Sequence, residues 1–275
     1  MLKLEKISKK YGQKRVLQEI HLDFKDQTGV YGLLGRNGVG KTTMMKIITN
    51  MVANYEGRVN RDFDLSHIVF VSSDVAATNG LFQGKITKLM SYYTSLYPKF
   101  DETYARELLA RFGLDPQARI KKLSTGNKTL VYNILGLATR EKVTIFDEPT
   151  NGLDSVNRQK FFEVMLDDYT QEPRLIILST HLIQEIENYL THVILLKDSM
   201  ILMDDAIETI QAKTMRISNA RIAHKRVLHE RHMGSMTETF VFDTLSDEDV
   251  QAVTAQDGTV TYYDLQTLFN YLVEE

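Results

Sequence analysis

The segment from Gly35 to Thr42 constrains this chain more than any other, because its residue types follow the order of one kind of loop. It has the sequence Gly-Arg-Asn-Gly-Val-Gly-Lys-Thr, which matches the pattern G-x-x-x-x-G-K-[ST] in full. The short apolar run Gly29–Leu34 precedes it, and Lys41–Met51 places apolar residues at helical spacing. We therefore expect a strand, a glycine-rich loop and a helix, which is the context of a phosphate-binding loop.

The chemistry of phosphate binding explains each residue type in this loop. Glycines let backbone N–H groups approach phosphate oxygens without a Cβ clash, and the following helix presents its free N–H groups to the anion. Lys41 can reach the β- and γ-phosphates, and the Thr42 hydroxyl can bind Mg²⁺. The residues expected to contact the nucleotide are Gly35, Arg36, Asn37, Gly38, Val39, Gly40, Lys41, Thr42 and Thr43.

A pair of acidic residues follows another apolar run. Val143–Phe146 leads directly into Asp147 and Glu148. A carboxylate at the carboxyl end of a central strand faces the crevice in which open α/β sheets bind nucleotides. We expect Asp147 to hold Mg²⁺ and Glu148 to orient and deprotonate the attacking water. The alternative is an acidic pair that caps a helix, and the phosphate loop favours the catalytic interpretation.

Composition excludes several classes of protein. The 275 residues suffice for one or two domains, and the absence of cysteine excludes disulfide scaffolds, thiolate zinc sites and cysteine nucleophiles. A formal net charge of −3 argues against a general nucleic-acid binder, so no nucleic-acid partner is expected. No apolar run approaches the roughly 20 residues that cross a bilayer, and Met1–Ile7 lacks a signal-peptide core. We therefore expect a cytoplasmic chain.

Hydrophobic periodicity outlines the remaining elements. Alternation predicts an antiparallel pair of strands over Met1–Ile7 and Val16–Phe24. Residues 84–140 are mostly helical in pattern, with Asp101 as an N-cap and Gly113 as a helix stop. Further strands and a hairpin are expected at Ile68–Val71, Val143–Phe146, Leu175–Leu178 and Val193–Met203.

The character of the sequence changes after about residue 210. Strand and cap patterns there predict a small α/β appendage over residues 211–275. Its basic, histidine-rich segment Arg221–His232 is interpreted as a solvated loop rather than as a site for acidic lipids or a partner. The expected strands and N-caps are Glu238–Asp243, Thr259–Tyr263, Ser246 and Asp264.

Taken in order, these motifs resemble a known family. The phosphate loop, Leu123–Asn127, Asp147–Asp154 and Ser179–His181 follow one another as in the nucleotide-binding domains of ABC transporters, and Tyr11 stands where that family stacks an aromatic ring on adenine. The resemblance implies an ATPase with ATP as substrate and Mg²⁺ as cofactor. It also implies an ATP-binding domain over residues 1–210. That domain would be a RecA-like α/β P-loop core with an antiparallel β subdomain and a helical subdomain around residues 75–140.

The resemblance further implies roles that depend on a second protomer. In a head-to-tail dimer, the signature loop would bind the γ-phosphate held by the opposite protomer. His181 would contact the γ-phosphate and act in catalysis with Glu148, and Asp154 would bridge the protomers. The signature residues are Ser124, Thr125, Gly126 and Asn127.

Two places depart from the family pattern. Thr125 and Asn127 replace a glycine and a glutamine of the usual signature, which is expected to weaken the ATP sandwich or to favour an asymmetric partner. The family glutamine that touches Mg²⁺ and the attacking water is absent after Ile68–Val71. Ser73 and Asp74 are the candidates to replace it.

Within the family, Tyr97–Asp101 and Leu265–Val273 resemble bacterial exporter ATPases for drugs and antimicrobial peptides. This implies a homodimeric or heterodimeric subunit on the inner face of the cell membrane. The subunit would power export of drugs, antimicrobial peptides or lipids by a separate transmembrane permease. The aromatic-rich stretch Leu81–Leu114 is either helix core or a permease contact. Two alternatives stay open: a soluble ABC-type ATPase in translation or DNA metabolism, and a non-hydrolysing regulatory binder, against which Glu148 and His181 argue.

Overall fold

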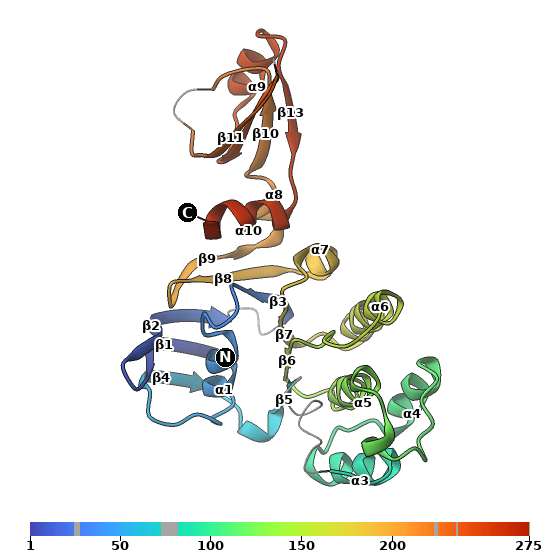
Figure 1. Cartoon of the computed structure of the whole chain (residues 1–275). Coiled ribbons are helices and arrows are strands. Elements are labelled where there is room, and N and C mark those ends of the chain that lie inside the picture. The colour runs from blue at the N-terminus through green and yellow to red at the C-terminus, as the bar shows by residue number, and fades with distance from the viewer. Residues whose placement is uncertain (25–27, 73–81, 223–224, 235, 275) are drawn as a thin grey trace. The chain divides into compact units, whose positions relative to one another are not determined.

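A computed structural model describes residues 1–24, 28–72, 82–222, 225–234 and 236–274. The chain divides into two compact units (Figure 1). The first contains Met1–His181 and His192–Asp204, and the second contains Leu182–Thr191 and Asp205–Glu275. The division into residues 1–210 and 211–275 stays a prediction, and the structure groups Leu182–Thr191 with the C-terminal unit.

A six-stranded sheet forms the centre of the first unit, with strand order β5-β6-β7-β3-β8-β9. The strands from β5 to β8 in this order pair in parallel and are almost entirely buried, as expected for a sheet covered on both faces. The predicted strands and the β8–β9 hairpin are confirmed. The strands are β3 (Gly29–Leu34), β5 (Ile68–Ser72), β6 (Val143–Asp147), β7 (Leu175–Ser179), β8 (His192–Lys197) and β9 (Met200–Ala206).

A second, antiparallel sheet confirms the predicted N-terminal strand pair. It consists of β1 (Leu2–Tyr11), β2 (Lys14–Phe24) and β4 (Glu56–Arg61), in the order β2-β1-β4. Helix α1 (Lys41–Ile48) contributes apolar side chains to a core that also includes residues of both sheets. The prediction that this helix extends to Met51 is wrong. Thr49 is its C-cap, and Asn50 has a φ of 58°, which ends the helical path.

Helices follow β5 without a further strand until β6, in the part of this segment that the structure describes. The predicted N-cap and helix stop are confirmed, because Asp101 Oδ1 accepts from the Tyr104 N–H at 2.9 Å and Gly113 has a φ of 66°. Figure 1 shows these helices on the opposite side of the parallel sheet from the antiparallel sheet. These helices are α3 (Ile86–Leu96), α4 (Glu102–Arg111), η2 (Ile120–Lys122), α5 (Thr125–Ala138) and, after β6, α6 (Ser155–Gln171). A short 3-10 helix, η1 (Leu65–His67), precedes β5.

The aromatic residues of the helical segment divide into two groups. Tyr93 packs against Tyr97 and Phe100, with ring centroids 5.5 Å and 5.7 Å away. Tyr92 meets Phe82 but is 46% exposed. Part of the predicted stripe is therefore helix core, and part of it faces solvent.

The second unit is built on a four-stranded antiparallel sheet with the order β11-β12-β10-β13. The predicted N-caps are confirmed, because Ser246 forms a capping box with Asp249 and Asp264 accepts from the Thr267 N–H. The elements are α7 (Ile183–Ile186), η3 (Glu187–Tyr189), α8 (Ile207–Gln211), β10 (Thr214–Ser218), β11 (Val227–Met233), β12 (Met236–Phe242), α9 (Asp247–Thr254), β13 (Thr259–Tyr262) and α10 (Leu265–Glu274).

The interpretation of Arg221–His232 as a loop is wrong for its second half. Residues from Val227 onward form the edge strand β11, which pairs with β12. Every side chain of β11 is exposed or half-buried, so no alternation of apolar and polar residues marks it in the sequence. No helix in the described ranges of the chain combines the length and the apolar character needed to cross a membrane.

Candidate nucleotide-binding site

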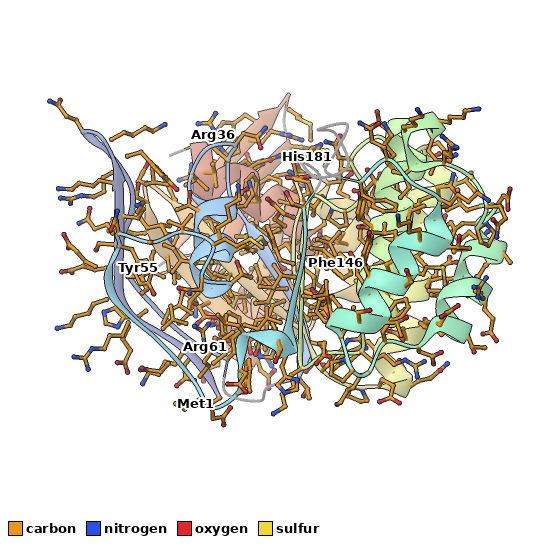
Figure 2. All side chains as sticks on the ribbon, turned by 90° about the horizontal axis from the view of Figure 1, so that it is seen from below. Met1, Arg36, Tyr55, Arg61, Phe146 and His181 are labelled. Atoms are coloured by element: carbon orange, nitrogen blue, oxygen red, sulfur yellow. The ribbon has the colours of Figure 1, made fainter. Side chains whose placement is uncertain are left out.

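The predicted phosphate loop joins β3 to α1 at the carboxyl edge of the parallel sheet. Figure 2 shows Arg36 and His181 at this end of the first unit, with Met1 and Arg61 at the other end. Gly35 has a φ of 147° and Gly40 a φ of 124°, and a Cβ at either position would lie 2.7 Å from a backbone oxygen. The loop therefore packs so closely on neighbouring strands that only glycine fits at these two places.

A cavity of about 370 Å³ opens beside this loop. The structure brings the adenine-ring candidate Tyr11, most of the phosphate loop and both acidic candidates to its wall. Lys14 and Val16 also line the cavity, and no motif in the sequence marks them. The full lining is Tyr11, Lys14, Val16, Asn37, Gly38, Gly40, Lys41, Thr42, Thr43, Asp147 and Glu148.

The Lys41 ammonium is folded into the loop. Its Nζ donates to the Gly35 carbonyl at 2.6 Å and to the Arg36 carbonyl at 3.3 Å, and the residue is 7% exposed. Burial lowers the pKa of Lys41, and the carboxylates of Glu148 and Asp147 oppose that shift. A cation thus lies inside the ring of backbone atoms that would surround a phosphate, close to two acidic groups.

Asp147 ends β6 and is held by two hydroxyl groups. Its Oδ2 accepts from Thr42 Oγ1 at 2.7 Å, and its Oδ1 accepts from Ser179 Oγ at 2.6 Å. The residue is 4% exposed. Carboxylate and hydroxyl oxygens are hard donors of the kind that Mg²⁺ takes from proteins alongside water and substrate phosphates. The donor set of Thr42 and Asp147 therefore fits this ion.

Glu148 follows in a left-handed conformation, with a φ of 52°. Its N–H lies 3.2 Å from the Ser179 carbonyl oxygen and 3.1 Å from Ser179 Oγ. Its Oε2 lies 2.9 Å from Nδ1 of His181. The two residues predicted to act in catalysis are thus within hydrogen-bond distance, although 33 positions separate them along the chain.

Tyr11 ends β1 at the cavity and is 50% exposed. Lys9 Nζ lies 4.9 Å from the centre of its ring. Lys9 is itself buried, and its ammonium donates to the carbonyls of Ala53 and Asn54 at 3.0 Å and 2.8 Å. One face of the tyrosine ring is therefore held by a fixed cation.

The signature residues lie elsewhere on the same unit. Ser124 is the N-cap of α5, where its Oγ accepts from the Asn127 N–H at 3.2 Å. Gly126 packs against the loop after β6, so that a Cβ there would lie 2.3 Å from the Gly152 oxygen. None of the predicted signature residues, Thr125 included, lines the cavity of its own chain.

Asp154 caps α6 within its own chain. Its two carboxylate oxygens accept from the backbone N–H and the side-chain amide of Asn157 at 2.8 Å and 2.9 Å, and these bonds lower its pKa. The substitutes expected for the missing glutamine, Ser73 and Asp74, lie outside the described residues.

One residue of this site has a contact that sequence reasoning did not identify. In the sequence Ser179 is marked only as the first residue of the segment Ser179–His181, yet it touches both acidic residues. The available signal was a hydroxyl at the last position of an apolar strand, since a buried hydroxyl requires a partner.

Comparisons with known proteins agree with this geometry. A family model described as ABC transporter matches residues 17–151. The ABC transporter ATP-binding protein YtrB of Bacillus subtilis (strain 168) is 30% identical over 204 residues, which are 72% of this chain and 70% of the relative. The lantibiotic transport ATP-binding protein SrtF of Streptococcus pyogenes is 29% identical, covering 68% and 83% of the two chains. The zinc uptake system ATP-binding protein ZurA of Listeria monocytogenes serovar 1/2a is 29% identical, covering 76% and 87%.

The fold is also that of a solved cassette. The dimeric structure of MJ0796, a bacterial ABC transporter cassette, has a TM-score of 0.63 at 22% identity and covers 75% of this chain and 99% of its own. The predicted α/β P-loop fold with its β and helical subdomains is therefore confirmed. With the phosphate loop, the acidic pair and YtrB as a relative over most of both chains, this protein belongs to the ATP-binding proteins of the ABC transporter family and is an ATPase.

Proposed function

We propose that this ATPase binds Mg²⁺–ATP in the cavity beside the phosphate loop and powers export by a separate transmembrane permease. The catalytic part of this proposal rests on the meeting of groups from distant segments in one cavity. The Lys41 ammonium, the Thr42–Asp147 oxygen pair and the Glu148 carboxylate all line one cavity, although they come from segments over 100 residues apart.

In this proposal the chain's own groups divide the work. Lys41 and the loop N–H groups bind the phosphates, and the Tyr11 ring supports the adenine. Thr42 and Asp147 would hold Mg²⁺, which offsets phosphate charge when it is bound. Glu148 accepts a proton from the attacking water, and His181, 2.9 Å from its Oε2, orients that carboxylate.

The signature residues and Asp154 are assigned to the opposite protomer of a dimer. Their support is geometric, because Ser124 and Gly126 do not line the cavity of their own chain. They lie at the N-terminus of the 14-residue helix α5, where free N–H groups and the helix dipole favour an anion. The binding site of an ATP held by one chain would thus be completed by a second chain, in a homodimer or a heterodimer. The second chain would contribute Ser124, Thr125, Gly126 and Asn127.

Transport and its direction are the further part of the proposal. Relatives are named for lantibiotic transport and for zinc uptake, so similarity to relatives alone is compatible with export and with uptake. Export of drugs, antimicrobial peptides or lipids is favoured by the resemblance of Tyr97–Asp101 and Leu265–Val273 to exporter ATPases. The chain would then act at the inner face of the membrane through its permease.

The catalytic proposal is tested with Glu148→Gln. Loss of a general base typically costs roughly 10²–10⁴-fold in rate. We expect phosphate release to fall by that factor while equilibrium ATP binding persists. Glu163→Gln is the matched control, because Glu163 is a surface residue of α6 bonded to Gln159. Near-normal phosphate release by Glu148→Gln would remove the role of Glu148.

The transport proposal is tested by affinity purification of the chain from detergent-solubilised membranes. We expect an integral membrane protein to copurify. In inside-out vesicles that contain both proteins, ATP outside should drive cargo into the lumen if the system exports. Movement of cargo out of the lumen would indicate uptake. Absence of any membrane partner would favour the soluble ATPase acting in translation or DNA metabolism.

A further inference from the structure

Ser179 has the most constrained hydroxyl group next to the candidate site. It ends β7, all five residues of which are buried, and its own exposure is 0%. A hydroxyl in such surroundings requires hydrogen-bond partners, because leaving it bare costs the full desolvation of the group. The partners found here are Asp147 and Glu148, the two acidic residues to which the catalytic roles are assigned.

The Ser179 hydroxyl bridges these two residues as a donor to one and as an acceptor from the other. The Ser179 O–H donates to Asp147 Oδ1, 2.6 Å from Oγ, and its oxygen accepts from the Glu148 N–H at 3.1 Å. The parallel register of β6 and β7 places Asp147 opposite Ser179, so the hydroxyl of Ser179 is within reach of the Asp147 carboxylate. The carbonyl of Ser179 lies 3.2 Å from the same Glu148 N–H. A single residue therefore holds the amide of Glu148 with both of its oxygens.

Two consequences follow for the acidic pair. Asp147 is clamped by hydroxyls on both of its oxygens, so its carboxylate cannot rotate without losing Ser179 or Thr42. Glu148 adopts a φ of 52°, which few residues other than glycine favour, so surrounding contacts must hold it there. The amide bonds from Ser179 are contacts of that kind, and they fix the peptide from which the Glu148 side chain points to His181.

Ser179 does not itself line the cavity, and it reaches the site through Asp147 and Glu148. We propose that Ser179 is a positioning residue for ATP hydrolysis. Its hydroxyl ties the carboxylate of Asp147 to the peptide of Glu148, so that the metal-holding group and the general base keep one mutual arrangement. This inference rests on the roles proposed above for Asp147 and Glu148.

The test compares Ser179→Ala, Ser179→Thr and Thr139→Val in the full chain. Ser179→Ala removes the hydroxyl, and Ser179→Thr keeps it. Thr139→Val is the matched control, because Thr139 is 0% exposed and its hydroxyl donates to the Gly136 carbonyl at the end of α5. Rates are measured at saturating Mg²⁺–ATP, and binding of labelled ATP is measured with and without Mg²⁺.

We expect Ser179→Ala to lower kcat by about 10–100-fold and to raise the Mg²⁺ concentration for half-maximal ATP binding, as is usual when a partner of a metal ligand is lost. Binding of ATP without Mg²⁺ should change less than about threefold, because Lys41 and its loop are untouched. Ser179→Thr should restore kcat to within about threefold of the wild type, and Thr139→Val should change neither quantity.

Two outcomes would overturn the inference: a folded Ser179→Ala protein with kcat within twofold of the wild type, or equal losses in Ser179→Ala and Thr139→Val. If Ser179→Ala does not fold, Ser179→Cys, which has similar size and a weaker donor, is measured by the same assays and the same criteria. Normal hydrolysis by Glu148→Gln would instead defeat the proposed function. A slow Glu148→Gln with a normal Ser179→Ala would defeat this inference alone.

Discussion

Helix propensity and close packing predict opposite effects on stability when Gly126 is replaced by alanine. Gly126 is the second residue of α5, and alanine is favoured over glycine in a helix interior by roughly 1 kcal/mol. Propensity alone therefore predicts that Gly126→Ala stabilises the protein. The tertiary structure predicts the opposite, because the new Cβ would lie 2.3 Å from the Gly152 oxygen and 3.1 Å from the Gly152 carbonyl carbon.

The size of the stability loss depends on which atoms must move to make room for the new methyl group. Ordinary carbon–oxygen contacts lie at about 3.3–3.6 Å, so the start of α5 and the Gly152 loop must separate by about 1 Å. The obstacle is backbone rather than the end of a flexible side chain. Overpacking of this kind costs about 1–3 kcal/mol, and the propensity gain near a helix end is below its interior value. We expect a net loss of about 1–2 kcal/mol in the free energy of unfolding.

The assay is urea unfolding of Gly126→Ala beside the wild type, followed by circular dichroism and by tyrosine fluorescence. Two probes are needed because the chain has two compact units whose transitions can separate. Thr125→Ala is the control, because Thr125 is exposed at the preceding position and its loss should change stability by less than about 0.5 kcal/mol. A Gly126→Ala protein at least as stable as the wild type would refute the packing argument.

Three further predictions concern the site and the core. Lys41→Ala should lose most ATP affinity in equilibrium binding with labelled ATP, because it removes the ammonium inside the loop; unchanged affinity would place the nucleotide elsewhere. Glu148→Gln should shift from monomer to dimer with ATP in light scattering, and added Ser124→Arg should abolish the shift; a dimer that survives would exclude the signature loop from the interface. Arg174→Ala should lower the free energy of unfolding by about 3–5 kcal/mol, because it strips the buried Asp168 carboxylate of a guanidinium partner; a urea-unfolding loss below about 1 kcal/mol would contradict this.

The sequence alone was sufficient to predict elements whose stabilising contacts lie within a few residues of one another. The caps Asp101, Ser246 and Asp264 each bond to a backbone N–H three positions on, so the pattern and the structure describe the same short segment. The β8–β9 hairpin was predicted for the same reason, since Asp198 and Ser199 form its turn with positive φ values.

Two elements were not evident from the sequence. Strand β4, Glu56–Arg61, is an edge strand with no buried residue, and its pairing with β1 is what makes it a strand. Helix α6 has a weakly amphipathic sequence, and its N-cap, Asp154, was interpreted as a bridge between protomers. Strand β4 depends on a partner far away in the chain, which no pattern within a few residues can encode. The cap of α6 is a local bond from the Asn157 N–H to Asp154, and it went unpredicted because Asp154 was given another role.

The sequence by itself determined the phosphate loop, because Gly35 and Gly40 allow backbone conformations that Lys41 and its helix then use, all within eight residues. It also determined that an acidic pair follows a buried strand. Only the tertiary structure decided that Ser179 lies between Asp147 and Glu148, 32 positions from the first. The physical reason is that the register of parallel strands is set by the packing of the segments that connect them, so it exists only once the whole sheet has formed.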